Sequence, residues 1–131
     1  MGMYTELHFN SQLEESVPNG VVLVLEYMLD SSLSEPSLPS HPLFETDRWR
    51  YMFRMDSYYF DADTHSTLRY DDIASAYFLC VRCNLKNYSG EISKFLDWIM
   101  PYLHQIDNAF LGFYRYEEDE NPTLIYYREK E

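Results

Sequence analysis

Carboxylates are the most numerous side chains in this sequence that could act on another molecule. The chain of 131 residues carries 22 Asp and Glu against 10 Lys and Arg, a formal net charge of −12. Eight of these acidic residues lie in one run and two pairs: Glu117, Glu118, Asp119 and Glu120, then Asp61 and Asp63, and Asp71 and Asp72. Such clusters attract basic protein surfaces and repel nucleic acid and anionic membranes. The sequence therefore predicts that these carboxylates bind a partner, with independently solvated loops as the alternative.

Part of this acidic sequence has the spacing of a metal-binding loop. Asp61, Asp63 and His65 stand at alternate positions, and Asp72 takes the place of the last ligand of a calcium loop. The glycine that such a loop needs at its sixth position is replaced by Ser66. A solvated hairpin turn is the alternative, and we expect no bound metal and no cofactor. A metal-dependent hydrolase built on these residues is the last of three functional hypotheses.

Arginines form the second charged group. Arg48, Arg50 and Arg54 alternate with aromatic residues, so a strand would place the three on one face, and Arg82 on a later strand could lie nearby. Because guanidinium groups bind phosphates and carboxylates, this group favours a pocket for a nucleotide-like anion. The alternative is a set of surface arginines paired with the surplus carboxylates.

The two cysteines have the spacing of a redox or zinc pair. Cys80 and Cys83 form a single CxxC motif, and no second motif completes a four-ligand set. The motif lies in a predicted strand, where residues three apart point to opposite faces, so the sulfurs cannot converge. We therefore expect structural cysteines and no disulfide.

Composition places the chain among folded proteins despite its charge. Aromatic residues make up 18% and hydrophobic residues 46% of the sequence, which is ample material for a core. The length fits a single domain over residues 1–131. The start lacks the pattern of a signal peptide, and the longest apolar run, at 21–25, is too short to span a membrane. These features favour a cytoplasmic protein.

Hydrophobic periodicity predicts the first part of the fold. Alternation predicts a strand over 3–12, and helical spacing predicts a helix over about 18–29, although the run 21–25 also fits a buried strand. Residues 31–47 are rich in Ser and Pro and predict a loop. Four further strands are expected after this loop, at 48–55, 57–60, 67–70 and 76–85.

A second helix and a hairpin complete the predicted order. Ser89 is the expected N-cap, and Ile92, Phe95 and Ile99 then share one helical face until Pro101 kinks or stops the helix. Segments 109–116 and 123–128 predict a final hairpin. The order β-α-β-β-β-β-α-β-β predicts an α+β fold. It has a largely antiparallel sheet of about six to seven strands, with two amphipathic helices packed on one face.

Five short segments carry a resemblance to a known group of proteins. They are KNYSGEI (86–92), FLDWIMPY (95–102), RYEE (115–118), PTLIY (122–126) and YYFD (58–61). Together they resemble small uncharacterised acidic proteins of bacteriophages and prophages. The resemblance implies a bacterial cytoplasmic setting and carries no catalytic residues.

The charge and the resemblance together lead to the expected function. Small acidic phage proteins often act as stoichiometric inhibitors of host defence or nucleic-acid machinery. We therefore expect a non-enzymatic counter-defence inhibitor that binds a basic bacterial protein, such as one that handles nucleic acid. Direct contact with nucleic acid or membrane is not expected. The second hypothesis is a protein that binds or sequesters a nucleotide-like anion through the four arginines.

Overall fold

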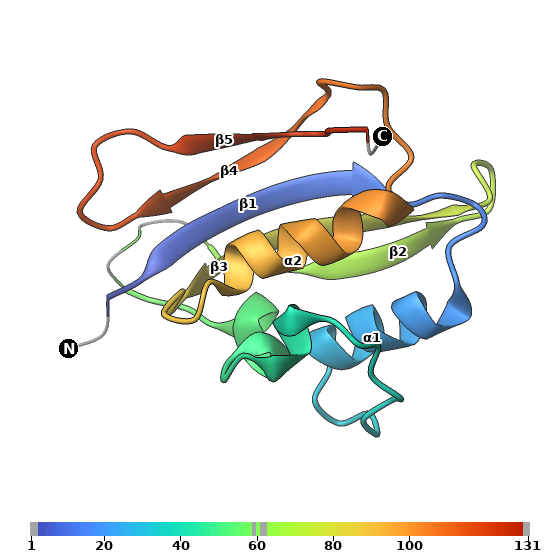
Figure 1. Ribbon diagram of the computed structural model, residues 1–131, viewed down its shortest axis with the longest axis horizontal. Helices are drawn as coiled ribbons and strands as arrows, with labels where there is room; N and C mark the ends of the chain where they lie inside the picture. Colours follow the sequence, from blue (N-terminus) through green and yellow to red (C-terminus); the bar gives the residue numbers. More distant parts are fainter. Residues whose placement is uncertain (1–2, 59, 61–62, 130–131) are drawn as a thin grey trace.

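The fold is α+β and is built around one open sheet (Figure 1). The structure is a computed structural model and describes residues 3–58, 60 and 63–129. Five strands form the sheet in the spatial order β2-β3-β1-β4-β5, and every neighbouring pair is antiparallel. The strands are β1 Thr5–Gln12, β2 Thr67–Asp71, β3 Ala76–Leu85, β4 Phe110–Tyr116 and β5 Thr123–Tyr126.

The helices lie on one side of this sheet, as Figure 1 shows, so the α+β prediction is confirmed. Two α-helices and three 3₁₀-helices are present in the described residues: α1 Asn19–Leu29, η1 Pro42–Glu45, η2 Trp49–Arg54, α2 Glu91–Ile99 and η3 Met100–Tyr102. The apolar run at 21–25 belongs to α1 and not to a buried strand. The loop predicted at 31–47 contains η1 near its end.

The prediction of six to seven strands is wrong, because segment 48–55 folds as η2. Trp49, Met52 and Phe53 are buried, at the spacing of three to four residues that a helix uses, while Tyr51 is exposed. A strand would have buried Trp49, Tyr51 and Phe53 together.

The strand predicted at 57–60 is also absent from the described part of the chain. Ser57, Tyr58 and Phe60 lie outside every strand, and position 59 is outside the described residues. The observed order of the regular elements is therefore β-α-β-β-α-β-β, with η1 and η2 after the first helix and η3 after the second.

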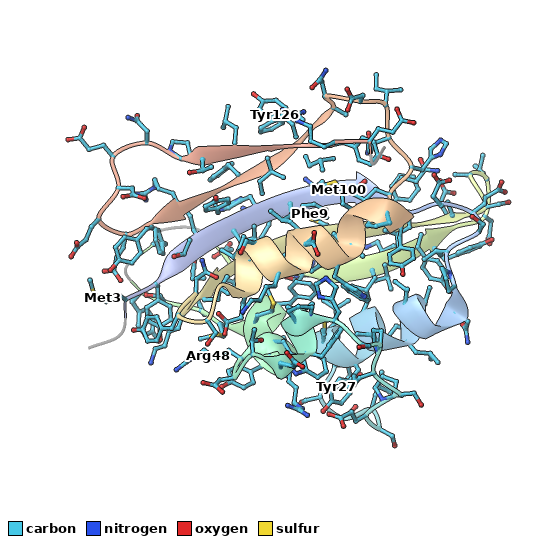
Figure 2. The ribbon with its side chains drawn as sticks, viewed as in Figure 1. Met3, Phe9, Tyr27, Arg48, Met100 and Tyr126 are labelled. Atoms are coloured by element: carbon cyan, nitrogen blue, oxygen red, sulfur yellow. The ribbon has the colours of Figure 1, made fainter. Side chains whose placement is uncertain are left out.

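The core lies between the helices and one face of the sheet. Strand β1 is central and sends Leu7 and Phe9 to this face, where the ring of Phe9 packs edge-on against Phe95 of α2. Phe95 in turn contacts Phe53 of η2, so three elements share one aromatic centre. Figure 2 shows Phe9 on β1, next to α2. The other face of the sheet carries no helix of the described chain.

Helix α2 begins differently from the prediction but ends where the sequence indicated. The predicted cap, Ser89, is not used. Instead Gly90 adopts a left-handed conformation with φ 72°, and the Asn87 side chain accepts a hydrogen bond of 2.9 Å from the Ile92 amide. The side chain of an upstream asparagine thus satisfies one of the free amides of the first turn. Pro101 lies in η3, which terminates the helix as expected.

A bulge in β4 sets which side chains reach the uncovered face. The register between β4 and β5 shifts between Phe110 and Gly112, so Leu111 is buried while Phe110 is exposed. Gly112 has φ 151°, and a Cβ there would lie 1.8 Å from the backbone oxygen of His8. Only glycine allows β1 and β4 to approach this closely.

Candidate partner-binding surface

The run 117–120 forms the turn between β4 and β5. This turn is tied to the start of β1 from both directions, because the Glu117 amide donates to the Tyr4 carbonyl and the Tyr4 amide donates to the Glu117 carboxylate. Glu117 is therefore a structural residue. Glu118, Asp119 and Glu120 are exposed and form no ion pair with a described cation.

Arg115 connects this turn to the segment between η2 and β2, which carries two further acids. Its Nε and Nη2 donate to one oxygen of Glu6 at 3.0 and 2.8 Å, and its Nη1 donates to the backbone oxygen of Asp119 at 3.0 Å. The ring of Phe60 lies 5.2 Å from the guanidinium carbon on the remaining side. Because Arg115 already pairs with Glu6, it forms no ion pair with Glu118, Asp119 or Glu120 among the described residues.

Phe60 belongs to the segment that joins η2 to β2 and crosses the uncovered face at this end of the sheet. Two backbone hydrogen bonds hold the segment to β3. Near its start, the Met55 carbonyl accepts from the Asn84 amide, and near its end, the His65 amide donates to the Arg82 carbonyl. The segment carries two exposed acids, Asp56 and Asp63. Its predicted acidic residue Asp61 lies outside the described residues.

The exposed acids of these two segments, which Arg115 and Phe60 bring into contact, are together called the acidic surface: Asp56, Asp63, Glu118, Asp119 and Glu120. Figure 1 shows its two segments at the end of the sheet where the chain begins. The pKa of Tyr116, next to the turn, is raised by desolvation and then by the charges of Glu118 and Glu117. The contribution of the two glutamates to this raised pKa has the sign that a negative local potential produces.

Asp71 and Asp72 do not belong to this surface. They lie at the β2–β3 turn, where Asp71 pairs in register with Ala76 and accepts a hydrogen bond of 3.0 Å from the Ile73 amide. Asn84, beside the acidic surface, is eight residues further along β3, which corresponds to about 27 Å. The acidic residues that the sequence predicted as partner-binding therefore lie at two opposite ends of the sheet (Figure 1).

The same separation divides the predicted metal loop. Asp63 and His65 lie beside Arg82, at the opposite end of the sheet from Asp72. Among the residues that the structure describes, no three His, Cys, Asp or Glu side chains are grouped as a metal ion requires.

The predicted arginine pocket is not assembled either. Arg48, Arg50 and Arg54 lie at or within η2, on the helical side of the sheet, where Figure 2 shows Arg48. Arg50 pairs with Glu35 at 2.8 Å, and Arg54 donates to the Met28 carbonyl at 3.2 Å. Arg48 stacks on Tyr88 at 4.9 Å. Arg82 pairs in register with His8 on the uncovered face, and therefore lies on the other side of the sheet.

The cysteines have the opposite orientations that the strand predicted. Cys83 is fully buried in the core, and this burial raises the pKa of its thiol far above the usual range. Cys80 lies partly exposed on the uncovered face, paired in register with Asn10 of β1 and Thr67 of β2. Neither sulfur can reach the other across the strand.

Sequence reasoning missed an apolar strip on the uncovered face of β4 and β5. Phe110 is 59% exposed, Leu124 48% and Tyr126 36%, and the rings of Phe110 and Tyr126 meet at 5.9 Å. Beside them Phe113 stacks on His8 with ring centres 4.5 Å apart. The signal was available, because 110–114 is apolar on both faces apart from Gly112, whereas a half-exposed strand alternates.

Comparisons with known proteins place the chain in no established group. No family model, no curated protein and no solved structure matches it. Within the described residues, no helix is both long and apolar enough to cross a membrane.

Proposed function

We propose that this chain is a non-enzymatic interaction protein that binds a basic surface of a bacterial protein through its acidic surface. The observation that carries the proposal is the junction at Arg115, which connects the two acidic segments while its own charge is paired with Glu6. In line with the phage resemblance, the proposed role is inhibition of a defence or nucleic-acid-handling protein.

Preorganisation supports the proposal. The β4–β5 turn is tied down by the hydrogen bonds between Tyr4 and Glu117 and by Arg115, so little backbone freedom remains to be lost on binding. Carboxylates held in place without ion pairs speed the encounter with a cationic partner, and this effect weakens as salt is added. Tyr58, which is fully exposed in the second acidic segment, supplies an aromatic side chain of the kind that anchors interfaces.

A pair of matched variants tests the proposal. Glu118→Gln with Glu120→Gln removes two charges from the acidic surface, and Asp71→Asn with Asp72→Asn removes two charges from the opposite end of the sheet. Both change the net charge equally, and neither touches Glu117 or Arg115.

Each variant and the parent protein are immobilised and used for capture from bacterial lysate at low and then high salt. We expect the parent and the Asp71/Asp72 variant to retain the same basic protein at low salt and release it at high salt. The Glu118/Glu120 variant should retain several-fold less. Equal retention by all three proteins, or retention of nothing by the parent, contradicts the proposal.

A further inference from the structure

We propose that the partner contributes an extended segment, flanked by Lys or Arg, that adds to the free edge of β5 as a sixth strand. This inference rests on the proposed function and states how the basic partner is held. Strand addition uses backbone hydrogen bonds for affinity and alternate side chains for specificity.

The outward edge of β5 is unpaired in the described chain. β5 ends the strand order and pairs only with β4, and Figure 1 shows no helix or strand beyond it. The Tyr127 amide donates to the Ala109 carbonyl and the Tyr127 carbonyl accepts from the Asn108 amide, at 2.8 and 2.9 Å, so Tyr127 bonds toward β4. Because backbone groups alternate along a strand, Leu124 and Tyr126 direct their N–H and C=O groups outward.

This edge is short but lacks the charges and prolines that often protect an edge strand. β5, with the sequence TLIY, contains no charged residue and no proline. The opposite edge strand, β2, carries Arg69 and Asp71. Charges and prolines on edges hinder pairing with other chains, so by this measure β5 is more open than β2.

Both sides of the edge offer space for the side chains of an added strand. On the uncovered face lies the apolar strip of Phe110, Leu124 and Tyr126. On the helical side, a cavity of about 630 Å³ lies between α2 and the residues that follow β5, with Leu96, Met100 and Tyr127 in its lining. Alternate side chains of an extended segment point to these two sides in turn.

Charge selects the occupant. The carboxylates of Glu118 and Glu120 precede β5, while Asp107 and Glu129 lie at its other end, joined by a hydrogen bond of 3.1 Å from the Glu129 amide. Arg128, the cation there, donates to the Asn108 side chain at 2.7 Å. A second copy of this chain would bring carboxylates against carboxylates. An apolar segment with basic flanks fits both ends.

The test uses a proline variant and a matched control. Leu124→Pro removes an N–H that points away from β4. The hydrogen bonds between β4 and β5 therefore stay intact, as is usual for proline on an edge strand. Leu124→Thr shortens the same side chain but keeps the N–H. The probe is the peptide most enriched when a random-peptide display library is selected against the parent protein.

We expect the enriched peptide to place Lys or Arg on either side of a β-branched or aromatic core. Leu124→Pro should weaken its binding at least tenfold, and Leu124→Thr should change it by less than about threefold. In case the proline variant does not fold, hydrogen exchange of the parent protein gives a second measurement. The amides of Leu124 and Tyr126 should become protected when the peptide binds.

The outcomes separate this inference from the proposed function. No enriched peptide, unchanged binding to a folded Leu124→Pro variant, or unprotected amides at Leu124 and Tyr126 overturns strand addition. If the peptide still binds more weakly to the Glu118/Glu120 variant than to the Asp71/Asp72 variant, the acidic surface keeps its proposed role. Loss of binding with Leu124→Pro but equal binding to both charge variants supports the strand and overturns the acidic contribution.

Discussion

Replacement of Arg115 by alanine tests how the acidic surface is held in place. Two nitrogens of Arg115 donate to one oxygen of Glu6, whose side chain is only 11% exposed, and a third binds the Asp119 carbonyl. Without Arg115, the largely buried Glu6 carboxylate loses the guanidinium that it pairs with. The turn also loses its link to Phe60.

The expected cost follows from this burial. Leaving a fully buried charge unpaired costs about 3–5 kcal/mol, whereas an exposed pair is worth under about 1 kcal/mol. The Arg115 side chain is 29% exposed, so water replaces part of what the pair supplied. We therefore expect Arg115→Ala to lower the free energy of unfolding by about 2–3 kcal/mol, and the midpoint by roughly 6–12 °C.

Urea denaturation of the single and double variants checks this reasoning. Adding Glu6→Gln to Arg115→Ala removes the stranded charge, so the double variant should recover about 1 kcal/mol relative to Arg115→Ala. A cost below about 0.5 kcal/mol for Arg115→Ala is what a plain surface substitution gives. That result, or a double variant no more stable than the single one, would refute the account of this junction.

Three further perturbations give separate tests. A bulky thiol reagent should label Cys80 in the native protein and leave Cys83 unmodified until unfolding, because burial raises the pKa of Cys83; equal labelling rates contradict this placement. Gly112→Ala should destabilise by more than about 3 kcal/mol in thermal or urea unfolding, since its Cβ meets the His8 backbone oxygen; a neutral result means that β1 and β4 are further apart. Burial, as the largest cause, lowers the pKa of His8 below its ordinary value of 6.5. The unfolded chain therefore binds more protons than the folded one, and the free energy of unfolding falls as the pH drops below 6.5. His8→Gln should reduce that slope in urea titrations at several pH values, and an unchanged slope excludes His8 as its source.

Elements with a single clear periodicity were predictable from sequence. The alternation in β1 and β3 and the helical spacing in α2 each bury one continuous face, and the structure confirms all three. Segment 48–55 was ambiguous, because its aromatic residues satisfy a period of two while Trp49, Met52 and Phe53 satisfy a helical one. Packing against α1 and β3, together with the contact between Phe53 and Phe95 of α2, decides between them.

The candidate site was predictable in composition but not in arrangement. The sequence identified the acidic runs, yet their grouping depends on contacts among Glu6, Phe60 and Arg115, which come from three distant segments. The separation of Asp71 and Asp72 from the rest depends on the antiparallel course of β2 and β3. The exposed position of Phe110 depends on the bulge at Gly112, for which the isolated glycine was the only local signal.

The association rate of the captured partner, measured against salt concentration, tests the central claim most directly. With the parent protein and the Asp71/Asp72 variant, the rate constant should fall steeply as salt rises. With Glu118→Gln and Glu120→Gln together, it should start lower and depend less on salt. The same slope for both charge variants would contradict a binding role for the acidic surface.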